Sequence, residues 1–175
     1  MMKLKASNSL PPKPTLIQLA KGLVGGFLSI LVLAYLGMST NTPWLMAPFG
    51  ATCVLLFAVP SSPLAQPRNI IVGHFICSLV GLIALYSLGN SIFVMSLAVG
   101  IAIMLMQYFR SIHPPAGANP LVIILVGKDV VGFDFLITPV LTGSFVLVGI
   151  AMIINNGGEK NKWPIYWHGF EQDKE

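Results

Sequence analysis

Acidic residues are almost absent from this sequence. No aspartate or glutamate precedes Asp129 in a chain of 175 residues. Between Gly22 and Gly127 the residues with formal charge are Arg68 and Arg110. Only 9% of all residues are charged, against about 25% in a typical soluble domain, while 55% are hydrophobic. A domain of this composition could not cover its surface against water, so we predict an integral membrane protein and exclude a soluble one.

The residues of common catalytic and metal sites are also scarce. The two cysteines, Cys53 and Cys77, lie inside apolar segments without metal-ligand spacing, and we interpret both as packing residues. We find no phosphate-binding loop, no metal-ligand cluster and no nucleophile beside a base. We therefore expect no metal, no other cofactor and no enzymatic activity. The net charge of +4 comes largely from lysines near the N-terminus, which indicates membrane orientation rather than nucleic-acid binding.

Long apolar segments are what the sequence does contain. Each of the continuous ones can cross a membrane as a helix. They are about Leu16–Leu36, Ile70–Leu88, Ile92–Phe109 and Phe135–Ile154. We predict an all-α, polytopic fold with a single transmembrane domain over residues 16–154. A basic tail (1–15) precedes this domain and a polar tail (155–175) follows it.

Two further apolar segments, Trp44–Pro60 and Ile112–Gly127, are shorter and begin with prolines and glycines. Proline is tolerated in the first turn of a helix but not in its interior. Each segment therefore predicts an irregular arm followed by a half-helix. Such backbone occurs at membrane depth only where protein buries it or water reaches it.

The two broken segments resemble each other. Pro48-Phe49-Gly50-Ala51-Thr52 aligns with Pro115-Ala116-Gly117-Ala118-Asn119, 67 residues later. A predicted full helix stands before and after each of them. The chain thus predicts an internal repeat with halves of about 16–88 and 92–154.

The positions of the charges bear on the topology. If each broken segment crosses the membrane, the N-terminal lysines, Arg68 and Arg110 fall on one side. The uncharged links Gly37–Pro43 and Gly89–Ser91 then fall on the other side, as the positive-inside rule requires, and the repeat is inverted. If the broken segments are instead re-entrant, four helices span and the two arginines lie opposite the N-terminus. We favour the inverted arrangement and leave the re-entrant one open.

The polar residues of the broken segments are the candidate substrate site. A half-helix N-terminus presents unpaired backbone N–H groups and a partial positive charge, which suit an anion. Glycine lets a ligand approach the backbone closely, and Thr52 and Asn119 occupy equivalent positions where their side chains can donate hydrogen bonds. His113 begins the Pro-Pro break and can donate to an anion or respond to pH. The predicted substrate-binding residues are Gly50, Ala51, Thr52, His113, Gly117, Ala118 and Asn119. The alternative is that these motifs only permit tight helix packing.

Three further residues are candidates for the pathway or its mouth. Arg68 and Arg110 stand at the edges of apolar segments and can attract anions, or can anchor the topology at the lipid headgroups. His74 lies inside a predicted spanning segment, where it faces a cavity or bonds another helix.

The longest of these motifs carries a family resemblance. His113-Pro114-Pro115-Ala116-Gly117-Ala118-Asn119-Pro120 resembles the signature of the HPP family of integral membrane proteins. Pro48–Thr52 and the stretch Ser62–Asn69, followed by Gly73-His74, resemble other shared stretches of that family. The resemblance covers about Thr42 to Ile154. It implies a bacterial, cyanobacterial or plastid protein, and a four-helix topology that fits the re-entrant arrangement at least as well. It also implies nitrite transport, in which plastid and cyanobacterial members are implicated.

These observations together predict a transport protein for a small inorganic monovalent anion, with nitrite as the first candidate. The expected location is multi-pass in a membrane, the bacterial inner membrane first. The lack of intramembrane carboxylates disfavours a sodium or proton antiporter of the usual acidic kind. The expected partners are the anion, the lipid bilayer and a second copy of the chain, for which Gly22, Gly25 and Gly26 offer a contact face; no nucleic acid is expected. The alternative is a structural or assembly membrane protein without transport activity.

Overall fold

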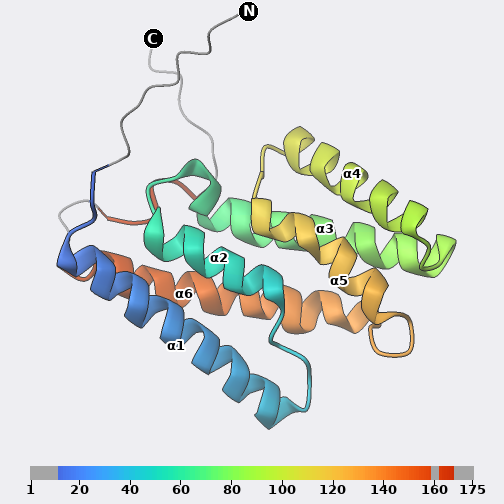
Figure 1. Cartoon of the computed structure of the whole chain (residues 1–175), viewed down its shortest axis with the longest axis horizontal. Coiled ribbons are helices and arrows are strands. Elements are labelled where there is room, and N and C mark those ends of the chain that lie inside the picture. The colour runs from blue at the N-terminus through green and yellow to red at the C-terminus, as the bar shows by residue number, and fades with distance from the viewer. Residues whose placement is uncertain (1–11, 159–161, 168–175) are drawn as a thin grey trace, which may run out of the picture.

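The computed structural model describes residues 12–158 and 162–167, and every regular element within them is helical (Figure 1). The all-α prediction is therefore confirmed for this part of the chain. In order, the elements are α1 (Leu16–Thr40), α2 (Ala47–Ala58), η1 (Pro63–Ala65), α3 (Pro67–Leu88), α4 (Ile92–Tyr108), η2 (Pro114–Ala118), α5 (Asn119–Val126), η3 (Phe133–Leu136), η4 (Ile137–Leu141) and α6 (Thr142–Asn156). The two broken segments appear as predicted, α2 after an irregular arm and η2 running into α5.

Three segments are long and apolar enough to cross a membrane: α1, α3 and Phe133–Asn156. The fourth predicted span, α4, has 17 residues and belongs with α2 and Pro114–Val126 among the shorter apolar helices. Four full transmembrane helices are therefore not confirmed, and a crossing by α4 stays a prediction. Large apolar side chains such as Leu16, Leu23 and Ile92 are exposed, as lipid-facing residues are.

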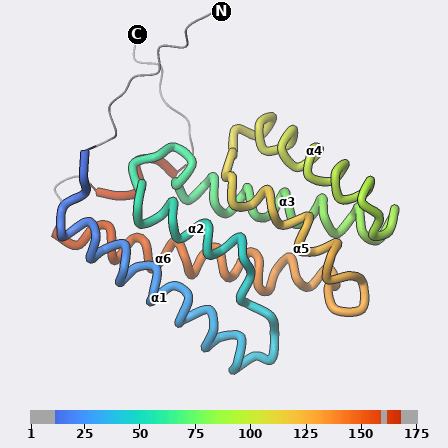
Figure 2. The backbone as a smooth tube through the Cα atoms, viewed as in Figure 1, coloured from blue at the N-terminus to red at the C-terminus, as the bar shows by residue number. Residues whose placement is uncertain are grey.

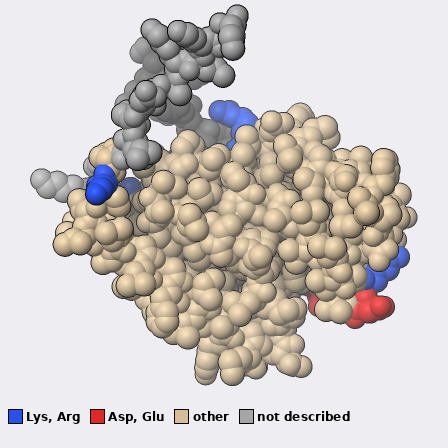
Figure 3. All heavy atoms as spheres, viewed as in Figure 1, with Lys and Arg blue, Asp and Glu red and all other residues tan. Residues whose placement is uncertain are grey.

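Consecutive helices alternate in direction (Figures 1 and 2). The links after α2 and α4 lie at the end where α1 begins, and the links after α1, α3 and α5 lie at the other end. The guanidinium of Arg68 donates to the carbonyls of Arg110 (2.5 Å) and Phe109 (2.7 Å), so both arginines lie at the first of these ends. Uncharged residues cover the broad face between the ends (Figure 3). This is the geometry that the six-crossing arrangement requires; the inverted repeat itself stays a prediction.

The last apolar segment is not the continuous helix that we predicted over Phe135–Ile154. Thr138 is extended (φ −128°, ψ 114°), and a regular α-helix begins only at Thr142. Thr138 precedes Pro139, whose ring disfavours helical backbone in the residue before it. The prediction of a continuous helix followed the apolar composition of this segment and overlooked the break that Pro139 indicates.

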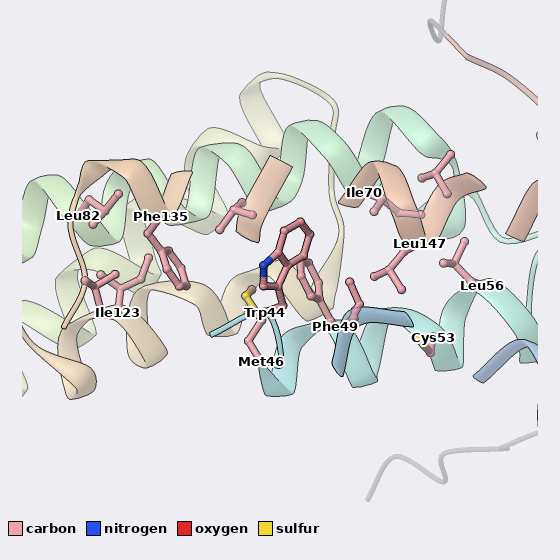
Figure 4. Packing of buried hydrophobic residues seen from close by; sticks show 14 of the residues in the cluster. Trp44, Met46, Phe49, Cys53, Leu56, Ile70, Leu82, Ile123, Phe135 and Leu147 are labelled. Carbon is pink, nitrogen blue, oxygen red and sulfur yellow. The ribbon is translucent and has the colours of Figure 1, made fainter. Parts of the chain in front are cut away.

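The larger of two clusters of buried apolar side chains among the described residues includes side chains of α2, α3, α5 and α6, with Phe49 fully buried (Figure 4). Gly143 on α6 makes room for the Phe49 ring, because a Cβ atom at this glycine would lie 2.5 Å from Phe49 Cε2. Lipid is as apolar as this core, so close packing rather than exclusion of water holds the helices together.

Glycines also set the approach of α3 to the second broken segment. A Cβ atom at Gly73 would lie 2.9 Å from His113 Cβ, and one at Gly81 would lie 2.8 Å from Pro120 Cα. Both distances are below van der Waals contact. Only glycine at these two positions allows the backbones to come so close.

The predicted oligomer face on α1 is partly used within the chain. Gly25 packs on the ring of Phe57 in α2, where a Cβ atom would lie 2.4 Å from Phe57 Cδ1. Gly22 and Gly26 have open space around them. Gly25 is therefore an intramolecular packing residue and not part of an outer contact face.

Candidate functional site

Five polar side chains from three parts of the chain form one buried cluster. Thr52 lies in the second turn of α2, His74 and Ser78 lie one turn apart on α3, His113 precedes η2, and Asn119 begins α5. Each is at most 1% exposed. The structure thus brings together three of the predicted substrate-binding residues with His74, which we predicted for the pathway. Ser78 was not predicted.

The Thr52 hydroxyl is the junction of the cluster. Its Oγ1 atom lies 2.9 Å from Nε2 of His74, 2.9 Å from Nε2 of His113 and 3.0 Å from the carbonyl oxygen of Pro48. The outer nitrogen of each ring has a partner as well. His74 Nδ1 lies 3.0 Å from Asn119 Nδ2, and His113 Nδ1 lies 2.8 Å from the carbonyl oxygen of Leu64.

The chemistry of these partners assigns the ring hydrogens. A carbonyl oxygen only accepts, so His113 Nδ1 carries the hydrogen that binds Leu64. An amide nitrogen only donates, so His74 Nδ1 is the acceptor of an Asn119 hydrogen. In the neutral rings, His74 Nε2 then donates to Thr52 and His113 Nε2 accepts from it. The hydrogen bonds therefore run in one direction, from Asn119 through His74, Thr52 and His113 to Leu64.

Ring packing holds the two histidines in place. The His74 ring meets the Phe49 ring edge-on, with centroids 5.0 Å apart, and meets the His113 ring at 61° and 5.1 Å. Gly73 adds to this, because its missing side chain lets the backbone of His113 approach α3.

The stretch Ser62–Asn69 holds the segment that carries His113. The carbonyl of Leu64 accepts the hydrogen bond from His113 Nδ1, and the Asn69 side chain donates to the carbonyl of Ile112 (2.9 Å). The Arg68 guanidinium binds the carbonyls at the end of α4, and Arg110 is exposed with a φ of +52°. The observed contacts of Arg68 join α3 to the end of α4, a role that we did not predict, and the pore-mouth and headgroup-anchor roles both stay predictions.

The family model described as "HPP, transmembrane region" matches residues 11–164. The chain belongs to the HPP family. This establishes an integral membrane protein, in agreement with the apolar helices.

Two relatives from Dictyostelium discoideum, both described as transmembrane proteins, resemble this HPP chain. They are 37% and 35% identical to it over 166 and 174 residues. The matches cover 90% and 94% of this chain but 58% and 56% of the relatives, so the chain spans little more than half of their length. No solved structure matches it. The names of the relatives specify no substrate, and a bacterial location stays a prediction.

The HPP tripeptide has a clear local role. His113 is extended (φ −137°, ψ 97°), and Pro114 and Pro115 follow it in the first turn of η2, where proline is tolerated. Pro114 also disfavours helical backbone at His113. His113 is thus the last residue of the link between α4 and η2, and its side chain lies in the cluster.

The glycines of the two aligned motifs have open space at the position of a Cβ atom. Gly50 and Gly117 are half-buried, and a Cβ atom at either would meet nothing within 4 Å. Ala51 is exposed and Ala118 is half-buried. Packing within this chain therefore does not require glycine at either position, and space next to the backbone is available at both.

Two buried polar atoms near the HPP motif have no hydrogen-bond partner within the described part of the chain: Asn119 Oδ1 and Ser111 Oγ. Asn119 is 1% exposed and Ser111 is fully buried. Buried polar atoms are rarely left unpaired in proteins. These two mark places where a ligand or water would find an acceptor and a hydroxyl.

A separate cleft of about 920 Å³ lies at the end of the HPP domain where α1 begins. Its lining includes Lys13, Lys21 and Lys162, and the Lys21 ammonium donates to the carbonyl of Asn155 (3.1 Å). An anion that approaches this end of the protein meets positive charge. Within the described residues, no three His, Cys, Asp or Glu side chains are placed to hold a metal ion.

Proposed function

We propose that this HPP-family protein transports a small monovalent inorganic anion, with nitrite as the first candidate, through the buried cluster. The observation that carries the proposal is that Thr52 and Asn119 hydrogen-bond the His74 ring, while His113 packs against this ring and hydrogen-bonds Thr52. The two broken segments supply all of these residues except His74. In transporters with repeated broken helices, the substrate site lies where such segments meet.

The chemistry of the cluster suits a small anion. It offers two hydroxyls, an amide and two imidazoles, with no carboxylate among the described residues of α1 to α5. The orphan hydroxyl of Ser111 is a further donor, and the open space at Gly50 and Gly117 leaves room beside the backbone. A second charge on the substrate would cost several kcal/mol more in this apolar setting, so we expect dianions to be excluded.

The conformation described above is closed. Water reaches none of the five cluster side chains. Transport therefore requires the second broken segment to move relative to α2 and α3. The bonds that must exchange are those of His113 with Thr52 and of Asn119 with His74.

The second candidate is a structural membrane protein in which the cluster only fastens helices together. The observation that favours it is that nearly every polar atom of the cluster has a partner inside the chain. A packing device would have the same appearance.

Flux into proteoliposomes separates the two candidates. Proteoliposomes that contain the purified protein should take up nitrite saturably and faster than empty liposomes. The comparison with empty liposomes is needed because protonated nitrite leaks through lipid alone. Asn119→Leu should reduce this uptake, whereas Asn90→Leu, in an exposed link, is the matched control. If folded protein moves no anion from a panel of nitrite, nitrate and formate, transport is wrong and the structural function stands.

A further inference from the structure

The Thr52 hydroxyl faces more acceptors than it has hydrogens. It carries one hydrogen, and both His113 Nε2 (2.9 Å) and the Pro48 carbonyl (3.0 Å) lie within its reach. With both rings neutral, the hydroxyl must donate to His113 Nε2, because that nitrogen carries no hydrogen of its own. Pro48 then receives nothing from Thr52.

One added proton is accommodated without moving a heavy atom. If it binds His113 Nε2, that nitrogen becomes a donor to Thr52 Oγ1. The Thr52 O–H bond rotates to Pro48, and Oγ1 accepts from both rings, which uses its two lone pairs. No bond is made or broken other than the new N–H bond. The ring nitrogens of His74 and His113 and the Thr52 hydroxyl are thus all hydrogen-bonded in both protonation states.

The added charge has no counter-charge nearby. On the elements around the cluster, the titratable and charged groups within the described residues are Lys21, Tyr35, Cys53, Arg68, Cys77, Tyr86, Tyr108, Arg110 and Asp134. Asp134 is the carboxylate among them, and its helix η3 packs beside Tyr86, which lies about 18 Å along α3 from His74. Neither ring hydrogen-bonds any of these groups. A buried imidazolium without a partner is costly. A monovalent anion beside it removes that cost.

The two rings together hold only one extra proton. Their centroids lie 5.1 Å apart, and two like charges at this distance repel strongly in a buried site. The first proton therefore opposes a second.

We propose that His113, Thr52 and His74 form a proton-binding site that is loaded together with the anion, so that the protein carries one proton with each monovalent anion. The inference rests on the proposed transport function and specifies its coupling. Movement of the pair is electroneutral. It needs no intramembrane carboxylate, because the histidine takes the role that acidic residues have in other proton-coupled transporters.

The test uses the whole protein in proteoliposomes that contain a pH-sensitive dye. Nitrate is the probe, because its conjugate acid does not form near neutral pH and cannot leak through lipid. With the membrane potential clamped at zero, an inward nitrate gradient should acidify the lumen at about one proton per nitrate. An imposed potential should change the rate little. An inward proton gradient should drive nitrate to accumulate.

The outcomes separate coupling from transport. Nitrate uptake that carries current and leaves the lumenal pH unchanged overturns the coupling and leaves the transport function standing. If neither nitrate nor protons move through folded protein, and nitrite and formate do not move either, both proposals are wrong.

Substitutions at Thr52 test the switch itself. Thr52→Val removes the hydroxyl and nearly preserves the shape of the side chain. Proton movement should then fall about tenfold or more, whether nitrate uptake continues or also falls. Thr52→Ser keeps the hydroxyl and should keep the ratio of protons to nitrate even where its rate differs. A Thr52→Val protein that moves both ions in the wild-type ratio would show that this hydroxyl is not the switch.

Discussion

Thr52 and Asn119 bind opposite nitrogens of the His74 ring: Thr52 Oγ1 lies 2.9 Å from Nε2, and Asn119 Nδ2 lies 3.0 Å from Nδ1. These two residues occupy the same position in the two aligned motifs of the sequence. The two aligned positions thus meet on one side chain that belongs to neither broken segment, while the repeat itself stays a prediction. Any movement of one segment against the other must change a bond to this ring.

Loss of the Asn119 amide should destabilise the fold. Asn119→Leu leaves His74 Nδ1 and Ser78 Oγ without their present donor, and we expect a loss of about 1–2 kcal/mol in the free energy of unfolding. Thermal unfolding in detergent should show a lower midpoint than wild type, with Asn90→Leu near wild type. Equal midpoints for wild type and Asn119→Leu would mean that these bonds contribute nothing to the closed state.

A methyl group at Gly73 should displace the HPP segment. Gly73→Ala places a Cβ atom 2.9 Å from His113 Cβ and 3.1 Å from the carbonyl oxygen of Ser111, and neither atom is the end of a flexible side chain. We expect a loss of about 1–3 kcal/mol of stability and slower anion uptake. Gly100→Ala on α4 is the control, because nothing lies within 4 Å of its Cβ position and alanine favours the helix. Similar behaviour of the two variants would contradict the close approach.

The two arginines should behave differently. Arg68→Gln loses the bonds to the carbonyls of Phe109 and Arg110 and should cost about 1–2 kcal/mol of stability, whereas Arg110→Gln should change stability by less than about 0.5 kcal/mol. The measurement is thermal unfolding combined with uptake at two salt concentrations. If both variants keep wild-type stability and raise the KM for the anion in a salt-dependent way, the arginines serve the pore mouth instead.

Labelling of single cysteines should reveal the topology. In a Cys53→Ala, Cys77→Ala background, Ser61→Cys and Arg110→Cys should react with an impermeant thiol reagent from one side of the membrane. Asn90→Cys should react from the other side. All three positions are exposed. Labelling of Ser61→Cys from the side opposite to Lys13→Cys would eliminate six crossings and support re-entrant segments.

Selectivity should follow charge and size. The donors of the cluster can serve any small oxyanion, and nitrite, nitrate and formate differ by roughly one hydrogen bond, so they should compete within about 1–2 kcal/mol of one another. Sulfate should compete poorly because of its second charge. Competition against labelled nitrite measures both. A strong preference for nitrite over formate would require a discriminating contact outside this cluster.

Some of the site was open to prediction from sequence and some was not. The alignment of the two motifs identified Thr52 and Asn119, and the Pro-Pro break identified His113. Ser78 was missed although it stands four residues after His74, a spacing that places both on one helix face. The carbonyls of Pro48 and Leu64 could not be found, because every residue has a backbone carbonyl and the sequence does not show which one is a partner.

The fold shows the same division. Apolar length predicted the helices, and the prolines predicted the two short segments. The break at Thr138 was also encoded, by Pro139, but the apolar composition around it led to the prediction of a continuous helix. The anchoring contact of Arg68 required three dimensions, since its partners lie more than forty residues away in the sequence.

Gly73 and Gly81 lie eight residues apart on α3, or about 12 Å along its axis, and both face the second broken segment. At these two points no side chain of α3 has to change its rotamer for that segment to slide past. In the transport that we propose, these two points would offer little steric resistance to sliding, and the exchange of hydrogen bonds at His74 and His113 would set the kinetic barrier. A solvent kinetic isotope effect on the opening rate would be the signature of such a protein, because its slow step moves hydrogens rather than carbon side chains.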